Sequence, residues 1–283
     1  KIFLLAFSLG IVLPLVSLIL VDLAKSSIHS EEDLKMVTSL PVVGHIPHSR
    51  LSYNTVVLNE PRSRVAEAFR TIRTRMEFLT RDTACPIIVV TSSIPGEGKT
   101  FAAINLASAY SLTGKRTLLM GFDLRRPTIS ASFELNGHPG LSTYLIGKNS
   151  VGEIIFETGH PNLSFIPSGP IPPNPGELAN SARAMELLEG LRKRFDFIII
   201  DSAPIGVVAD NFRVASVADA ILMIVRHGRT DRNHLRTTLS ELQTSGVESI
   251  GLIVNDVKTR GGTYSYSYSY KYGEKYVRAT QQV

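Results

Sequence analysis

The residues whose types and spacing point most directly to chemistry form a glycine-rich run, Ser-Ser-Ile-Pro-Gly-Glu-Gly-Lys-Thr, at positions 92–100. A short apolar run precedes it and a helical pattern follows, which is the context of a phosphate-binding loop. Gly96 and Gly98 let backbone N–H groups converge on phosphate oxygens. Lys99 is placed to reach the β and γ phosphates, and Thr100 to hold Mg²⁺ through its hydroxyl. The run therefore predicts ATP and Mg²⁺ as cofactors.

This loop departs from the usual G-x-x-x-x-G-K-[ST] pattern at its first position, where Ser93 replaces a glycine. The alternative is an ordinary glycine-rich turn that carries a surface lysine. The flanking strand and helix patterns and two acidic strand ends further along the chain favour the phosphate loop. The residues predicted to contact the nucleotide are Ser93, Pro95, Gly96, Glu97, Gly98, Lys99, Thr100 and Phe101.

Two aspartates supply candidate carboxylate ligands. Asp201 ends one apolar run, and Asp123 follows another. Ligands of α/β sheets bind at the carboxyl ends of the strands, so both aspartates are predicted to hold Mg²⁺ with Thr100, directly or through water. The alternatives are a turn or cap residue at 201 and a salt bridge from Asp123 to Arg125 or Arg126.

These residues need a scaffold, and the rest of the chain predicts one. Short apolar runs, separated by helical stretches, recur at 86–91, 116–120, 195–200, 220–225 and 250–254. Buried parallel strands that alternate with helices give this pattern, because helices cover both faces of the sheet. The predicted fold is α/β, a doubly wound, mostly parallel sheet flanked by helices, over residues 61–257.

The beginning of the chain, residues 1–25, predicts a transmembrane helix. From Ile2 to Val21 the sequence has 20 residues without a charge. At about 1.5 Å per residue they match a hydrocarbon core of about 30 Å. A buried core helix is the alternative. Since the first residue is not methionine, we interpret the chain as the C-terminal piece of a longer membrane protein. Residues 26–60 are polar and lack a sustained period, which predicts a juxtamembrane linker.

Composition excludes several classes of protein. The net charge of +5, from 30 Lys and Arg against 25 Asp and Glu, is too small to indicate a nucleic-acid partner. The single cysteine, Cys85, excludes a disulfide framework and a zinc site built from cysteines.

Together these motifs resemble the bacterial tyrosine kinase family, the cytoplasmic kinase modules of polysaccharide co-polymerases that regulate capsule and exopolysaccharide assembly. The loop at 92–100 is similar to the phosphate loop of that family. The run Phe-Asp-Leu-Arg-Arg-Pro at 122–127 is similar to its second acidic motif, and Ile-Asp-Ser-Ala-Pro at 200–204 to its third. The resemblance covers about residues 55–283, and the N-terminal apolar helix fits as the second of two spans in such proteins.

The resemblance implies a kinase in which Lys99, Asp123 and Asp201 are catalytic, with one departure. The family's second motif commonly carries two aspartates two residues apart, and here Gly121 occupies the first position. Asp123 is then the best remaining candidate for the base that deprotonates the acceptor tyrosine. Chromosome- and septum-positioning ATPases of similar architecture carry a signature lysine where this chain has Ile94, which argues against them.

One helix is a candidate for subunit contacts. Apolar residues recur at helical spacing over 62–79, which predicts an amphipathic helix. Glu67, Arg70 and Arg73 lie on neighbouring turns of it and resemble the helix through which family members form rings. They are predicted to pair across a subunit boundary, and exposed local salt bridges are the alternative.

The C-terminal segment, 258–283, is unusually rich in tyrosine and poor in aliphatic residues, which predicts a flexible tail. An aromatic edge strand is the alternative. The resemblance implies that these tyrosines accept phosphate from neighbouring subunits. The predicted acceptors are Tyr264, Tyr266, Tyr268, Tyr270, Tyr272 and Tyr276. Each phosphate adds about −1.5 to −2 charge, so phosphorylation would reverse the charge of this basic tail and weaken ring contacts.

The combined hypothesis is an autophosphorylating protein-tyrosine kinase that transfers the γ-phosphate of ATP between subunits and regulates capsular or exopolysaccharide polymerisation and export. Its expected location is the bacterial inner membrane, with the kinase domain cytoplasmic because ATP is available there. The expected partners are further copies of the chain in a ring, the membrane, the polysaccharide machinery and a phosphotyrosine phosphatase, but no nucleic acid. The alternative is a catalytically weak, ATP-dependent assembly switch in which Gly121 marks lost transfer.

Overall fold

The computed structural model describes residues 3, 10, 12–14, 26–51, 53–80, 83–206, 212–244, 247 and 249–258. Within them, eight strands form one sheet in the order β1-β8-β7-β2-β6-β3-β5-β4. The strands are β1 (Val42–Pro47), β2 (Ile87–Ser92), β3 (Thr117–Gly121), β4 (Phe156–Glu157), β5 (Leu163–Ile166), β6 (Phe197–Asp201), β7 (Ala220–Arg226) and β8 (Ile250–Val257). All neighbouring strands are parallel except β4 and β5. The predicted α/β fold with a mostly parallel sheet is confirmed.

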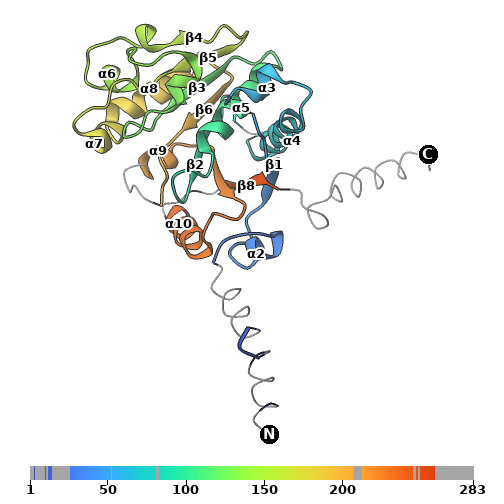
Figure 1. The fold of residues 1–283 in the computed structure, drawn as a ribbon. Helices are drawn as coiled ribbons and strands as arrows, with labels where there is room; N and C mark the ends of the chain where they lie inside the picture. Colours follow the sequence, from blue (N-terminus) through green and yellow to red (C-terminus); the bar gives the residue numbers. More distant parts are fainter. Residues whose placement is uncertain are drawn as a thin grey trace, which may run out of the picture.

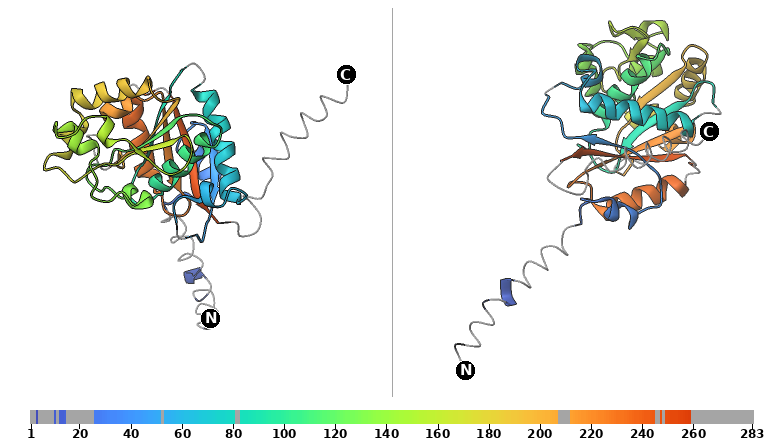
Figure 2. Two further views of the ribbon diagram at one scale, coloured as in Figure 1. Left: turned by 90° about the horizontal axis from the view of Figure 1, so that it is seen from above. Right: turned by 90° about the vertical axis from the view of Figure 1, so that its right-hand side faces the viewer.

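Helices cover both faces of this sheet (Figures 1 and 2). One face is packed by α3 (Val56–Asn59), α4 (Arg64–Leu79) and α5 (Lys99–Ser111). The opposite face is packed by α2 (Glu31–Lys35), α6 (Leu141–Leu145), α7 (Pro175–Ala179), α8 (Ala182–Arg192), α9 (Phe212–Ser216) and α10 (Arg232–Thr244). Two short 3₁₀ helices, Ile129–Phe133 and Gly152–Ile154, lie in the connections from β3 to α6 and from α6 to β4. Buried apolar side chains therefore alternate between two core layers along each central strand.

The predicted amphipathic helix over 62–79 is confirmed by α4. Its N-cap, Ser63, accepts a hydrogen bond from the backbone N–H of Ala66 (3.1 Å). Such a cap satisfies one of the free N–H groups at a helix start. The helix buries Phe69, Ile72 and Met76, whose spacing of three and four residues places them on one face.

The segment 26–60 differs from its prediction as a linker. Residues 42–47 form β1, an edge strand that pairs in parallel with β8. Val43 and Ile46 are buried beneath α4. A Cβ atom at Gly44 would lie only 2.4 Å from Ile72 Cγ1, so the strand approaches the helix at a glycine. The prediction was wrong because an edge strand of six residues, interrupted by a glycine and a histidine, has too weak a period to detect.

Two predictions fall largely outside the described part of the chain. Only positions 3, 10 and 12–14 of the predicted transmembrane helix are described, and the tail tyrosines lie within 259–283, which are not. The helices of the described residues include none with the length and apolar character needed to cross a membrane.

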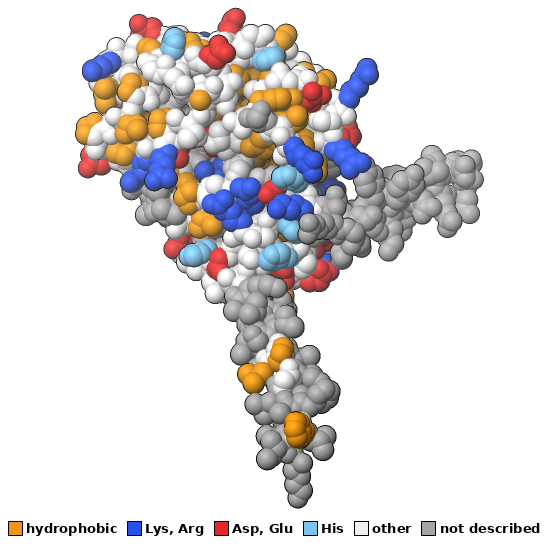
Figure 3. Space-filling model, viewed as in Figure 1, with side chains coloured by type: hydrophobic (Ala, Val, Ile, Leu, Met, Phe, Trp, Pro, Cys, Tyr) orange, Lys and Arg blue, Asp and Glu red, His pale blue; other side chains and the backbone are white. Residues whose placement is uncertain are grey.

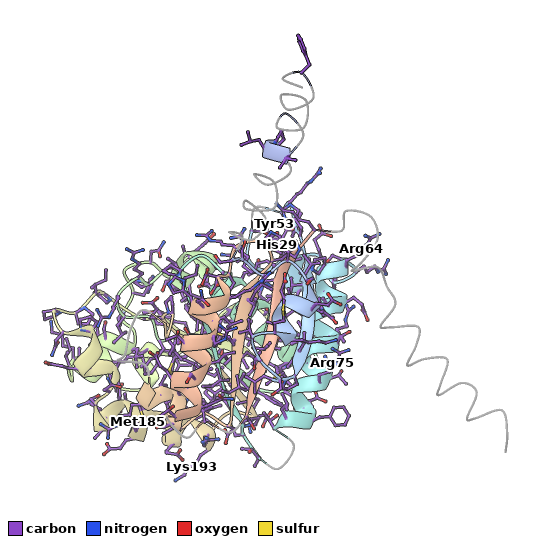
Figure 4. The ribbon with its side chains drawn as sticks, turned by 90° about the horizontal axis from the view of Figure 1, so that it is seen from below. His29, Tyr53, Arg64, Arg75, Met185 and Lys193 are labelled. Carbon is purple, nitrogen blue, oxygen red and sulfur yellow. The ribbon has the colours of Figure 1, made fainter. Side chains whose placement is uncertain are left out.

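In Figure 4, the parallel strands of the sheet begin at one end of the molecule and finish at the other. His29 and Tyr53 lie at one end of the molecule, and Met185 and Lys193 lie at the other. Lys193 follows α8, which leads into the start of β6. The His29 carbonyl oxygen lies 3.1 Å from Nε2 of His227, which comes just after the end of β7. The end with His29 is therefore the carboxyl edge, where α/β proteins bind ligands.

Candidate active site

The glycine-rich loop lies at the carboxyl end of β2, between β7 and β6 in the middle of the sheet. Gly96 and Gly98 adopt φ angles of 82° and 99°, in the left-handed region that favours glycine. Gly98 is also the N-cap of α5, and a Cβ atom there would lie 2.1 Å from Asn255 Nδ2. The free N–H groups at the start of α5 and the loop backbone together make a site for an anion.

The side chain of Glu97 is fully buried and stabilises the loop through hydrogen bonds. One carboxylate oxygen accepts the backbone N–H of Ile94 (3.0 Å), and the other accepts the hydroxyl of Thr230. Burial raises the pKa of Glu97, although these hydrogen bonds lower it in part. The Glu97 side chain thus organises the loop, and any contact of this residue with a nucleotide would use its backbone.

Residues from the ends of β7 and β8 also support the loop, and sequence analysis missed them. Arg226 donates from Nη1 to the Gly96 carbonyl (2.7 Å) and from Nη2 to the Asp256 carboxylate (3.0 Å). Asn255 donates from Nδ2 to the Glu97 carbonyl (2.8 Å). Arg226, Asn255 and Asp256 all come just after strands that the sequence predicted, and this position was the signal that could have identified them. Figure 3 shows Lys and Arg side chains across the middle of one face, a distribution that attracts phosphate groups.

Thr100 and Asp201 meet at the start of α5 and the end of β6. The Thr100 hydroxyl donates to Asp201 Oδ2 over 2.8 Å. Burial raises the pKa of Asp201 to about 6, even though the charge of Lys99 and the Thr100 hydrogen bond lower it. The second oxygen, Oδ1, is buried and has no hydrogen-bond partner among the described residues. A hydroxyl beside an incompletely bonded carboxylate is a donor set that fits Mg²⁺.

Asp123 lies just beyond the end of β3. Its Oδ1 accepts the backbone N–H groups of Arg125 (3.1 Å) and Arg126 (2.9 Å), so the aspartate organises a tight turn. The negative charge of Asp123 contributes to the raised pKa of Asp201, which places the two carboxylates in one neighbourhood. The structure thus brings Asp123, Asp201, Lys99 and Thr100 to one edge of the sheet, while their catalytic roles remain predictions.

Gly121 is the last residue of β3 and pairs with Asp201 across the neighbouring strand. A Cβ atom at this position would lie 2.6 Å from Ser168 Oγ and 2.8 Å from Ile129 Cγ2. An aspartate cannot enter this space unless its neighbours move. The local packing therefore favours a glycine at position 121, where the family motif commonly has an aspartate.

The three residues predicted to contact other subunits are held by contacts within the chain. Arg70 Nη1 lies 2.6 Å from Glu67 Oε2, an ion pair between successive turns of α4. Arg73 donates from Nη1 to the Ala109 carbonyl near the end of α5 (3.0 Å) and approaches Glu77 (3.6 Å). A subunit contact through these residues stays a prediction.

Comparison with known proteins places this geometry in a family. A family model described as an AAA domain matches residues 85–245. The chain is 35% identical over 219 residues to tyrosine-protein kinase YwqD of Bacillus subtilis, covering 77% of this chain and 92% of that protein. It is 30% identical over 273 residues to tyrosine-protein kinase wzc of Salmonella typhimurium, covering 90% of this chain but only 38% of that protein.

Solved structures agree with these matches. The kinase domain of the Escherichia coli tyrosine kinase ETK is 29% identical and has a TM-score of 0.77, covering 86% of this chain and all of that domain (100%). The BceF tyrosine kinase domain is 32% identical with a TM-score of 0.76, covering 82% and 99% of the two chains. The septum site-determining protein MinD of Pyrococcus horikoshii, complexed with Mg-ADP, shares the fold at 22% identity and a TM-score of 0.52, covering 60% and 70%.

Proposed function

Because the chain belongs to the bacterial tyrosine-protein kinase family, we propose that it transfers the γ-phosphoryl group of ATP to tyrosines in the tail of a neighbouring copy. The observation that carries this proposal is the Thr100–Asp201 pair at the start of the helix that follows the glycine loop, where Asp201 Oδ1 is buried and has no partner among the described residues. The proposed acceptors are the six tail tyrosines named above, in residues 258–283.

The chain's own residues would act mainly by positioning and by charge stabilisation. Backbone N–H groups at Gly96 and Gly98 would hold the phosphates, and Lys99 would neutralise the charge that develops on them. Thr100 and Asp201, together with Asp123, would hold Mg²⁺, which would supply positive charge to stabilise the transferred phosphate. Asp123 is also the candidate that accepts the proton of the tyrosine hydroxyl, since Gly121 carries no carboxylate.

The wider biological role is a proposal that rests on the resemblance of the motifs. The kinase would form a ring and regulate capsular or exopolysaccharide polymerisation and export. A phosphatase would remove the phosphate groups from its tail tyrosines. Residues 1–25 would span the inner membrane, with the kinase domain on the cytoplasmic side where ATP is found. The relatives that carry the same core are named tyrosine-protein kinases, which favours catalysis over a weak assembly switch.

A mixing experiment tests the reaction and its direction together. One protein carries Lys99→Met and an intact tail, and the other is active but has phenylalanine at the six tail positions. Each protein alone should give no tail phosphotyrosine, whereas the mixture should label the Lys99→Met protein. Mass spectrometry identifies which chain is labelled. Protein that carries Lys148→Met, a change at an exposed lysine outside the loop, should label normally.

Two results would contradict the proposal. Tail labelling of Lys99→Met protein on its own would reject the nucleotide-site assignment. An unlabelled Lys99→Met chain in the mixture, with wild-type protein labelling normally in the same assay, would reject transfer between subunits.

A further inference from the structure

Ser168 is a buried polar residue that the proposed mechanism does not use. Its side chain is 1% exposed, and its Oγ has no hydrogen-bond partner among the described residues. Its backbone is well held, because its carbonyl accepts the N–H of Ser142 (2.9 Å). Buried hydroxyls in folded proteins almost always have a partner, so a well-placed exception indicates an unseen water or ligand.

The position of Ser168 ties it to the candidate active site. Its Oγ lies 2.6 Å from the point where a Cβ atom of residue 121 would stand. Gly121 and Asp201 are register partners on parallel strands, so a side chain at 121 would extend from the same face of the sheet as Asp201. The helix that carries Thr100 packs against that face. The hydroxyl of Ser168 thus occupies the space that the family's first carboxylate would need.

A second unpartnered oxygen lies on the same face. Asp201 Oδ1 is buried and has no hydrogen-bond partner in the part of the chain that the structure describes, although Oδ2 is bonded to Thr100. A buried water is stable where it can bond to two or more polar groups. The two unpartnered oxygens, one at the end of β6 and one beside the end of β3, provide such groups at the edge where the nucleotide is proposed to bind.

We propose that Ser168 is a positioning residue of the magnesium–nucleotide site, whose hydroxyl holds a water that bridges toward the Asp201 carboxylate. The inference rests on the proposed function and deepens it. Gly121 makes room for the serine hydroxyl, and the hydroxyl replaces a charged group with a neutral one. A hydroxyl can orient a water in the outer shell of the ion, but it cannot accept the proton of a tyrosine. Ser168 therefore affects Mg²⁺-dependent binding of the nucleotide.

The substitution Ser168→Ala separates this role from a structural one. The Ser168 hydroxyl has no partner among the described protein groups, so its removal breaks none of their hydrogen bonds and leaves almost no cavity. The nucleotide-free protein should therefore melt at the same temperature or higher. A hydroxyl that served only the fold would instead lower the melting temperature when it was removed.

Ser142→Ala provides the matched control. Ser142 is also buried, on the neighbouring helix α6, but its hydroxyl donates to the Pro170 carbonyl (2.7 Å). Its removal should lower the melting temperature and leave the effect of Mg²⁺ on nucleotide binding unchanged. The pair of variants compares a partnered with an unpartnered serine in one region of the fold.

Calorimetric titration of ADP, in Mg²⁺ and in EDTA, tests the inference on the full chain. For Ser168→Ala we expect a dissociation constant raised roughly tenfold in Mg²⁺, the lower end of the range for outer-shell residues, and unchanged in EDTA. A Ser168→Ala protein with the wild-type ratio of the two constants would overturn the inference alone. Wild-type protein that binds no ADP, or binds it without regard to Mg²⁺, would overturn the proposed function as well.

Discussion

Glu97 is a buried acid whose environment favours its neutral form. Burial raises its pKa above the ordinary value of 4.5, despite hydrogen bonds from Thr230 and Ile94. The folded state therefore binds a proton more tightly than the unfolded state does. The resulting contribution to stability is fully present below pH 4.5, and it is lost as the pH rises through the folded-state pKa.

The substitution Glu97→Gln should remove this pH dependence, because an amide of the same shape does not ionise. Relative to wild type, the melting temperature of the variant should rise as the pH increases above about 4.5, and the difference should level off once the pH exceeds the folded-state pKa of Glu97. Thermal melts in matched buffers measure the difference. Glu157→Gln, at an exposed position on β4, should follow the wild-type curve. Parallel curves for Glu97→Gln and wild type would contradict the explanation.

Helix α4 has one face that packs in the core of the domain and exposed residues that are proposed to contact another subunit. Its apolar face is buried, whereas the Glu67 side chain is 69% exposed and Arg70 is 40% exposed. Arg73 is only 21% exposed and donates to the Ala109 carbonyl of α5. Glu67 and Arg70 are therefore available to a second subunit, whereas Arg73 also holds two helices of the same chain together.

These differences divide the expected effects of alanine substitutions on α4. Glu67→Ala with Arg70→Ala should reduce the oligomer to a smaller species and change the unfolding free energy by no more than about 1 kcal/mol. Arg73→Ala should lower the unfolding free energy by about 1 kcal/mol, because it removes the hydrogen bond to the Ala109 carbonyl within the same chain. Light scattering after size exclusion measures the mass, with Arg64→Ala on the same helix as control. An unchanged mass for the double variant would reject the subunit contact.

The whole domain is closed at one edge by β1, so residues well before the phosphate loop belong to the same folded unit. His48, just after β1, donates its backbone N–H to the Val257 carbonyl (3.0 Å), and its Nδ1 lies 2.5 Å from Asp256 Oδ1. Asp256 in turn binds Arg226, which supports the loop at Gly96. The segment that follows the predicted membrane span is thereby connected to the strand that leads into the tail and to the nucleotide site.

Gly44→Ala tests how much this closure contributes to the stability of the whole domain. The added methyl group would overlap Ile72, so β1 or α4 must shift, and the unfolding free energy should fall by about 1 to 3 kcal/mol. Urea unfolding measures the change. Gly190→Ala in α8, where nothing lies within 4 Å of an added Cβ, should be neutral or stabilising by up to about 1 kcal/mol. Equal stability of Gly44→Ala and wild type would show that β1 contributes little.

Several features could be predicted because their signals are local. The apolar runs predicted five central strands, and all five are confirmed, as is the helix over 62–79. The phosphate loop was found from consecutive residues and their flanking pattern. In contrast, β1, β4 and β5 were missed, since they lie towards the edges of the sheet, where partial exposure weakens the apolar pattern.

The sequence by itself determined the fold class, the glycine loop and the two aspartates at strand ends, because each depends on the spacing of residues along one stretch of chain. Only the tertiary structure decided that Arg226 and Asn255 support the loop. It also decided that Ser168 fills the space beside Gly121. These contacts join residues on different strands, and no local pattern encodes which strand ends meet. Parallel strands need long crossover connections, so the neighbours of the site come from distant parts of the chain and are set by the order of the sheet.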